Sequence, residues 1–447
     1  MPFDHAAEPL PETACDVLVI GGGPAGSTAA TLLAEKGRRV VLLEKDRHPR
    51  FHIGESLLPL NLRIFERLGV REEVAALGVF KPGARFVSDE HGGHTAFSFA
   101  AGLNQAYTHS YQVPRAGFDA LLFDRARRAG ADARDGMRVL DVALDARAGH
   151  RVVAREDGGA PHAFRARYVI DASGRDTFLA GAMGSKARNP HNNTAAIYGH
   201  FRGVLPFADE PDGNITVHLF DEGWIWMIPL PDGVTSIGLV SNAGFFKRRQ
   251  GSVDAFLHAA LAAVPSVARR MEHAVPLGAA TFTGNYSYAS SVMHGDGWLM
   301  AGDAYAFLDP VFSSGVLLAM TSAEMGADVA DAWLDDPAGA APLARAFERK
   351  VKGAIDALSW LIYRINRPVL RDMFMAPNNT FRMRDGLVSL LAGDVHARLN
   401  RQPPVLAFKA AYYMLSLAHR CGYRLRAEGL VRVRPPVPER VTAPAAG

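Results

Sequence analysis

A glycine-rich turn between an apolar run and a helical pattern constrains this sequence more than any other feature. CDVLVI, from Cys15 to Ile20, is a short apolar run that leads into glycines, PAGSTAATLLAEKG from Pro24 has helical spacing, and RRVVLLEK predicts a second buried strand. The turn before the helix contains Gly21, Gly23 and Gly26 in G-x-G-x-x-G spacing. This order of strand, turn, helix and strand predicts a βαβ unit and therefore an α/β fold.

The same turn predicts a dinucleotide site. Gly21 permits the tight turn, Gly23 lets the backbone approach a pyrophosphate, and Gly26 lets the helix pack closely on the strand. The N–H groups of the first helical turn, which begins at Pro24 and Ala25, face the phosphates. Glu44 lies eighteen residues after Gly26, at the end of the second strand, where it can accept hydrogen bonds from ribose hydroxyls. An acid there disfavours a 2′-phosphate, so FAD and NAD remain.

A second group of residues, a strand followed by Gly-Asp and a helix, favours FAD over NAD. The run Trp298 to Met300 is followed by Gly302-Asp303, a loop, and a helix that begins between residues 313 and 315. An acid at a strand end can bind a ribityl chain, while the helix N-terminus faces the electron-rich edge of the flavin. FAD spans both ends of such a site, whereas NAD does not need the second.

These motifs together resemble a known superfamily. GGGPAG, the DASG from Asp171 to Gly174, and Gly302-Asp303 are similar in order and spacing to the three FAD fingerprints of the class A flavin monooxygenases and halogenases. The resemblance implies an FAD-binding Rossmann-like domain interleaved with an antiparallel-sheet substrate domain. Arg115, in RAGFD, resembles the arginine of an R-x-x-F-D element that approaches the cofactor. The alternative for Arg115 is a surface arginine at a helix end.

Two further motifs resemble the flavin-dependent halogenases. GWIWMIPL matches W-x-W-x-I-P and FLDPVFSSG matches F-x-x-P-x-x-S-x-G. In this family, reduced FAD and oxygen form a C4a-hydroperoxide that chloride or bromide attacks to give hypohalous acid. The resemblance implies that the two tryptophans shield the flavin and that the serine-glycine turn binds halide, although that turn could instead face the flavin carbonyl. The residues in these two matches are Trp224, Trp226, Ile228, Pro229, Phe307, Pro310, Ser313, Ser314 and Gly315.

A lysine completes the resemblance. Lys81, in FKPGARF, occupies the place of the family lysine that holds hypohalous acid, or forms a haloamine, and presents electrophilic halogen to an aromatic carbon. Taken alone, a lysine before Pro-Gly is a solvated turn residue. Gly54, Glu55 and Ser56 match the G-E-S segment that runs beside the flavin ring, where Gly54 allows backbone approach and Glu55 orders a helix start.

The length of 447 residues allows two or three domains. Stretches 108–113, 138–144, 196–203 and 214–220 alternate in polarity and predict an antiparallel substrate sheet. The last hundred residues have helical apolar spacing and predict a helical cap. We expect the FAD-binding domain in three parts, 14–90, 166–180 and 291–335. The other expected regions are a mixed segment 91–165 with a returning helix, the substrate sheet 181–290, the helical region 336–430 and a loose tail 431–447.

The composition limits the kinds of binding partner and the cellular location that we expect. Lys plus Arg exceed Asp plus Glu by 49 − 46 = 3, with no basic block, so nucleic acid is not expected. The two cysteines have no paired spacing, no metal site is expected, and neither a signal peptide nor a membrane span is evident, so we expect a cytoplasmic protein. No second Rossmann fingerprint for NADH is present, which predicts a separate flavin reductase.

The size and tail resemble compact halogenases that act on pyrroles held on a carrier protein, and their phenol-acting relatives. The substrate expected from this resemblance is an electron-rich aromatic compound, free or tethered to a carrier. The arginines from Arg364 to Arg371 and those of the tail are candidate contacts for an acidic carrier. Two alternatives remain open: an FAD-dependent monooxygenase or reductase without halide chemistry, and an inactive flavoprotein that serves as a binding partner.

Overall fold

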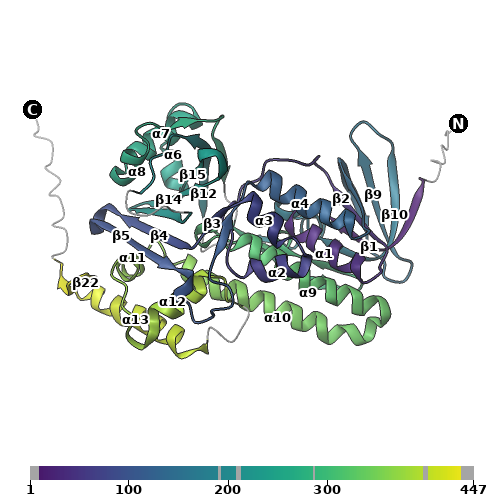
Figure 1. Ribbon diagram of the computed structural model, residues 1–447. Coiled ribbons are helices and arrows are strands. Elements are labelled where there is room, and N and C mark those ends of the chain that lie inside the picture. The colour runs from purple at the N-terminus through teal and green to yellow at the C-terminus, as the bar shows by residue number, and fades with distance from the viewer. Residues whose placement is uncertain (1–9, 190–192, 208–212, 285–286, 396–400, 434–447) are drawn as a thin grey trace, which may run out of the picture.

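A computed structural model describes residues 10–189, 193–207, 213–284, 287–395 and 401–433 (Figure 1). The predicted βαβ unit is formed by β1 (Glu12–Ile20), α1 (Pro24–Glu35) and β2 (Val40–Glu44), and β1 and β2 pair in parallel. The side chains from Val17 to Ile20 of β1 and from Val40 to Leu43 of β2 are buried, as expected of a parallel sheet covered on two faces. The α/β fold class is therefore confirmed.

The first sheet has the order β19-β20-β10-β1-β2-β7. Its further strands are β7 (Asp132–Asp135), β10 (Pro161–Asp171), β19 (His294–Gly295) and β20 (Trp298–Met300). β10 continues beyond the parallel part and pairs antiparallel with β9 (His150–Glu156), which pairs with β8 (Met137–Ala143). α1 packs between α4 (Arg115–Arg128) and α9 (Gly315–Asp335), and α10 (Pro337–Ile362) lies along α9 (Figure 1).

The second sheet is mostly antiparallel and has the order β16-β12-β15-β14-β13-β4-β5, with β17 (Thr281–Gly284) also on β12. Its strands are β4 (Gly83–Ser88), β5 (Gly93–Ser98), β12 (Thr194–Arg202), β13 (Ile215–Phe220), β14 (Gly223–Pro229), β15 (Val234–Asn242) and β16 (Val275–Pro276). The helices α6 (Ala243–Lys247), α7 (Val253–Ala262) and α8 (Pro265–Arg270) lie beside this sheet (Figure 1).

The structure differs from the expected substrate sheet at two of the four alternating stretches. Stretch 138–144 forms β8 of the first sheet, because its antiparallel partner β9 is joined to β10. Stretch 108–113 contains β6 (Ser110–Gln112), which pairs with β3 (Val79–Lys81) and forms an isolated bridge to Ser56. Polarity alternates on any half-buried strand, so the pattern alone does not choose the sheet.

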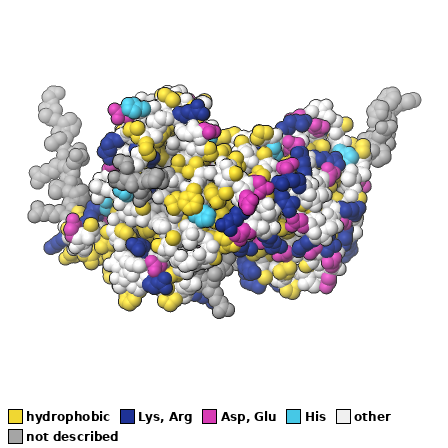
Figure 2. Space-filling model, in the orientation of Figure 1, with side chains coloured by type: hydrophobic (Ala, Val, Ile, Leu, Met, Phe, Trp, Pro, Cys, Tyr) yellow, Lys and Arg dark blue, Asp and Glu magenta, His cyan; other side chains and the backbone are white. Residues whose placement is uncertain are grey.

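Segments between the two sheets complete the centre of the molecule. α2 (Asn61–Leu68) and α3 (Arg71–Leu77) follow β2, and α5 (Phe178–Ala182) follows β10. A small sheet joins β11 (Lys186–Arg188), β18 (Tyr288–Ser290) and β21 (Ala306–Phe307). Over the half of the molecule that contains α1 and β2, Lys and Arg side chains are interspersed with Asp and Glu (Figure 2).

The C-terminal region is helical, with α11 (Pro368–Met375), α12 (Met383–Leu391) and α13 (Pro403–Arg420). Prolines begin α11 and α13, where the missing N–H costs nothing. β22 (Tyr423–Arg426) and β23 (Gly429–Arg432) form a hairpin, so the expected loose tail is wrong at residues 431–432; positions 434–447 lie outside the described residues. No helix in the described ranges has the length and apolar character needed to cross a bilayer.

Candidate functional site

A cavity of about 460 Å³ lies between the carboxyl ends of the first sheet and the face of the second. This volume is within the range of small-molecule and cofactor sites. The residues predicted from sequence that line it are Gly21, Gly23, Pro24, Ala25, Glu44, Gly54, Glu55, Ser56, Arg115, Gly174, Trp224, Trp226, Ile228, Asp303, Phe307, Pro310, Ser313 and Gly315. We call the part built from the β1–α1 turn, Glu44, Arg50 and Arg115 the nucleotide end. The part beside Trp224, Trp226, Glu55 and Ser56 is the reacting end.

Glycines form the cradle at the nucleotide end. Gly21 has a φ of +99°, which side chains rarely allow. Gly26 does not line the cavity, but a Cβ on it would lie 1.8 Å from the carbonyl oxygen of Gly21. Gly22 donates its backbone N–H to Glu44 Oε2 at 2.7 Å, and Asp46 N–H binds Oε1 of the same carboxylate. Glu44 therefore fixes the turn while it lines the cavity.

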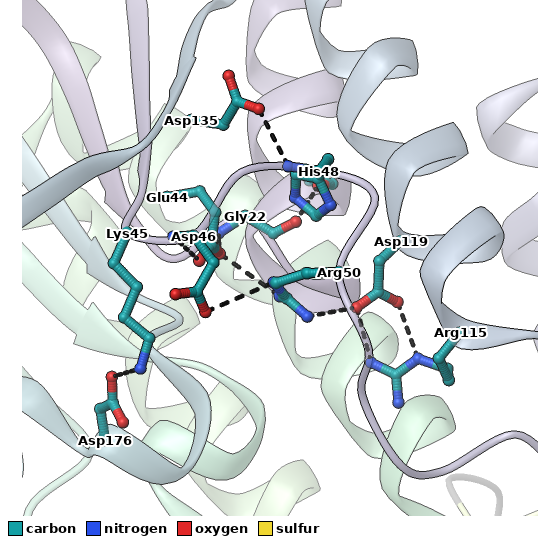
Figure 3. A network of polar contacts seen from close by, with 11 residues as sticks. Gly22, Glu44, Lys45, Asp46, His48, Arg50, Arg115, Asp119, Asp135 and Asp176 are labelled. Atoms are coloured by element: carbon teal, nitrogen blue, oxygen red, sulfur yellow. Dashed lines mark hydrogen bonds and ion pairs between the residues drawn. The ribbon is translucent and has the colours of Figure 1, made fainter. Parts of the chain in front are cut away.

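Figure 3 shows a row of charges at the nucleotide end that runs from Glu44 through Arg50 to Asp119 and Arg115. Arg50 contacts Glu44 Oε2 at 3.5 Å and Asp119 Oδ2 at 3.1 Å. Asp119 is buried, and its arginine partners lower the pKa of its carboxyl against the effect of burial. Sequence analysis missed Arg50, because Lys45, Arg47 and Arg50 all lie in the short segment between Glu44 and the G-E-S motif and no pattern distinguishes one from the others.

Arg115 is buried, so the alternative of a surface arginine is wrong. Its guanidinium donates to both oxygens of Asp119, at 2.8 and 3.0 Å, and to the carbonyl oxygen of Ile53. A Cβ on Gly54, whose φ is +105°, would lie 2.9 Å from the same guanidinium. Arg115 therefore holds the G-E-S segment against the cavity.

Asp171 and Asp303, the acidic residues of the second and third fingerprints, differ in their position relative to the cavity. Asp171 does not line the cavity; its carboxylate accepts the backbone N–H groups of Ser173 and Leu179 and shapes the turn. Asp303 lines the cavity, and burial raises the pKa of its carboxyl to about 7. Gly302 has a φ of +59° and lies against Ala319 of α9 rather than in the cavity wall.

Trp224, Trp226 and Ile228 form one wall of the reacting end, because side chains at i, i+2 and i+4 of β14 share a face. The two indole rings are 5.8 Å apart and buried. Pro229 does not line the cavity. Tyr198 of β12, which sequence analysis missed, lines it and packs against Trp226 at 6.0 Å.

The N-terminus of the long helix α9 opens onto the cavity through Ser313 and Gly315. Ser313 has a left-handed φ of +56°, and Ser314 is the buried N-cap residue and does not line the cavity. A Cβ on Gly315 would meet no described atom within 4 Å. This helix end offers free N–H groups and a positive dipole to a flavin carbonyl or an anion.

Lys81 is buried, so the alternative of a solvated turn residue is wrong. Its Nζ donates to Ser56 Oγ and to the carbonyl oxygen of Leu57, both at 2.8 Å. Burial lowers the pKa of the amine to about 7. Lys81 does not line the cavity itself; Ser56, which does, separates the two.

Glu55 does not order a helix start, since α2 begins six residues later at Asn61. Its Oε1 accepts a hydrogen bond from His200 Nε2 at 2.7 Å. Its Oε2 is buried and has no hydrogen-bond partner among the described residues. Sequence analysis missed His200, which lies on β12 in the second sheet.

FAD fits this cavity by several independent observations. The glycine cradle and the α1 N-terminus suit a pyrophosphate, Glu44 suits a ribose, and Asp303 lies at the opposite strand end. The N-terminus of α9 faces the same space, and apolar rings close its far wall. The donor set therefore matches an elongated dinucleotide with an aromatic end.

Comparison with known proteins agrees with this geometry. Residues 14–327 match the family described as FAD binding domain. A tryptophan 2-halogenase of Chondromyces crocatus is 37% identical over 70% of this chain and 60% of its own length. A 1H-pyrrole-2-carbonyl-[peptidyl-carrier protein] brominase of Pseudoalteromonas luteoviolacea is 32% identical over 70% of this chain and 76% of its own length. The solved structure of a flavoprotein/dehydrogenase from Cytophaga hutchinsonii superposes with a TM-score of 0.83 at 28% identity, covering 91% of this chain and all of that one.

Proposed function

The chain belongs to the flavin-dependent halogenases, within the FAD-binding-domain family, and binds FAD; on that premise we propose that it halogenates an electron-rich aromatic compound. Reduced FAD with oxygen supplies the oxidising equivalents that turn chloride or bromide into hypohalous acid. The observation that carries the proposal is a buried amine, Lys81, which is separated from a tryptophan-walled flavin cavity by one side chain, Ser56.

The cavity walls suit halide oxidation better than direct oxygen transfer. Trp224, Trp226 and Ile228 present indole and alkyl surface to the reacting end, which keeps an organic substrate away from the flavin. A halide ion is small enough to reach the N-terminus of α9, where Ser313 and Gly315 border the cavity. The protein then excludes bulk water and holds the anion beside the cofactor.

Lys81 relays the oxidised halogen. With the pKa of its amine near 7, a substantial fraction of Lys81 is neutral at physiological pH and has a lone pair for hypohalous acid. Ser110, which lies opposite Lys81 in the β3–β6 pair, has a buried hydroxyl without a hydrogen-bond partner among the described residues. The side-chain carbonyl oxygen of Gln112, two residues further along the same strand, is also buried and also lacks a hydrogen-bond partner among the described residues. These two unpartnered groups lie on the strand that pairs with the strand of Lys81, and they support a polar environment for the amine.

The substrate is a phenol or a pyrrole, either free or tethered to a carrier protein. The tethered form is supported by the name of the pyrrole brominase among the relatives. A carrier would not contact Arg371, which is buried and donates to the carbonyl oxygens of Ile365 and Gly223. Arg367, which is exposed, remains a candidate contact. A separate reductase supplies the reduced FAD, and the reaction takes place in the cytoplasm.

An FAD-dependent reductase or monooxygenase without halide chemistry is the second candidate, favoured by the similarity to the flavoprotein/dehydrogenase structure. The two are separated by incubating the protein with FAD, a flavin reductase, oxygen and a phenol or pyrrole, with and without bromide. We expect a brominated product by mass spectrometry only when bromide is present. A hydroxylated or reduced product that is indifferent to halide would contradict the halogenase proposal.

A further inference from the structure

Glu55 and His200 connect the flavin cavity to the outside of the protein. Glu55 lines the cavity with a side chain that is 1% exposed, and its Oε1 accepts from His200 Nε2 at 2.7 Å. The His200 side chain is 27% exposed and does not line the cavity. The exposed ring of Phe51 packs edge-on against the imidazole at 5.6 Å. The pair therefore has one carboxylate at the cavity and one imidazole that solvent reaches.

An ordinary structural ion pair does not explain this arrangement. A buried carboxylate is stable when both oxygens accept hydrogen bonds, as those of Glu44 and Asp119 do. Glu55 Oε2 lacks a partner among the described residues although it is fully buried. Because Glu55 lines the cavity, this oxygen is available to a group bound there, while the other oxygen is held by His200.

The proposed reaction needs a proton in that cavity. Its balance is FADH2 + O2 + X⁻ + ArH + H⁺ → FAD + ArX + 2 H2O, so one proton enters from solvent in each turnover. The wall formed by Trp224, Trp226 and Ile228 carries no group that titrates near neutral pH, so the proton donor must be another residue of the lining. A side-chain path through the wall supplies the proton without opening the cavity.

We propose that Glu55 and His200 form this path, and the proposal rests on the halogenase function given above. The O–H bond of protonated Glu55 breaks as a group in the cavity takes the proton. The carboxylate then takes the proton of His200 Nε2, and water reprotonates the imidazole. Rotation about the Glu55 Cγ–Cδ bond exchanges the two oxygens between steps. His200 acts through Glu55 and is a positioning and proton-supplying residue.

The charges around the pair suit this role. The hydrogen bond to Glu55 is the main cause that raises the pKa of His200 above its usual value. Tyr198, on the same strand, is buried and its pKa is raised, so it stays neutral and does not compete. Lys81 contacts the adjacent Ser56 rather than Glu55, and Arg175 acts on Tyr198. The carboxylate of Glu55 is therefore the group that favours protonation of His200.

The first test needs no turnover. The imidazole titration of His200 is followed by NMR in the protein without FAD, and the signal is assigned by its absence in His200→Ala. We expect the pKa of His200 to lie above its usual value in the wild type, because the imidazole donates to Glu55, and to fall in Glu55→Gln. A His200 pKa that does not change in Glu55→Gln would overturn the proposal, whether or not the protein proves to be a halogenase.

The second test separates proton supply from structure. His200→Ala should lower kcat about 10²-fold while leaving FAD affinity and the KM for the aromatic substrate unchanged, and added imidazole should restore the rate. His162→Ala is the matched control, because His162 is partly buried, bonds Thr13 at 2.8 Å and does not line the cavity. Loss of FAD binding in His200→Ala, or no rescue by imidazole, would contradict the proposal. If the wild type gives no halogenated product, the same comparison is made on flavin reoxidation.

Discussion

The two ends of the cavity differ in how their polar groups are satisfied. At the nucleotide end both oxygens of Glu44 and of Asp119 accept hydrogen bonds from the protein. At the reacting end Glu55 Oε2, and Ser110 Oγ in the strand pair that carries Lys81, have no partner among the described residues. Arg50 Nε at the nucleotide end also lacks a hydrogen-bond partner in the described chain, so the contrast is one between carboxylates: the protein holds both oxygens of Glu44 and Asp119, whereas one oxygen of Glu55 is available to a group in the cavity.

The strongest way to break the nucleotide end is Gly26→Ala. The added Cβ would lie 1.8 Å from the carbonyl oxygen of Gly21, so the turn must move away from the pyrophosphate position. We expect FAD affinity to fall roughly 100-fold or more, about 2.7 kcal/mol, by flavin fluorescence titration. Gly353→Ala in α10 is the control, because a Cβ there meets nothing within 4 Å. Unchanged FAD affinity in Gly26→Ala would contradict the assignment of this turn.

A smaller effect is expected from Arg50→Met. This change removes the cation between Glu44 and Asp119 but leaves Arg115 on Asp119. FAD affinity should fall about tenfold, near 1.4 kcal/mol, by the same titration. Arg47→Met is matched to it, since Arg47 is three residues away, mostly exposed and paired with Glu156. Equal affinities in the two variants would show that Arg50 plays no part in binding.

A third effect concerns stability at the reacting end. Burial lowers the pKa of Lys81 to about 7 in the folded protein, whereas the unfolded chain has the ordinary value of 10.5. Between these values the unfolded state binds more protons, so Lys81 makes the free energy of unfolding rise with pH. Denaturant unfolding at pH 7 and pH 9 should show a smaller rise in Lys81→Met than in the wild type. If the free energy of unfolding rises equally in Lys81→Met and in the wild type, the pKa of Lys81 is not lowered in the folded protein.

The fold and most of the nucleotide end could be predicted because their signals are local. The Gly21–Gly26 spacing and the alternation Trp224, Trp226, Ile228 each fix one turn or one strand face. His200 could not be found in this way, since this residue of β12 meets Glu55, in the segment between β2 and α2, across 145 residues of sequence. Arg50 and Tyr198 were missed for the same reason: their roles arise from tertiary contacts and match no motif.

The comparison of the two ends is tested most directly by Lys81→Met in a single turnover of the FADH2-loaded protein with oxygen, bromide and a phenol or pyrrole. Flavin reoxidation is followed by absorbance, and the halogenated product is counted per flavin oxidised. We predict that reoxidation proceeds as in the wild type while product per flavin falls about 10³-fold, because halogen transfer alone needs the amine. Product per flavin equal to that of the wild type would contradict the central claim that the reacting end acts through Lys81.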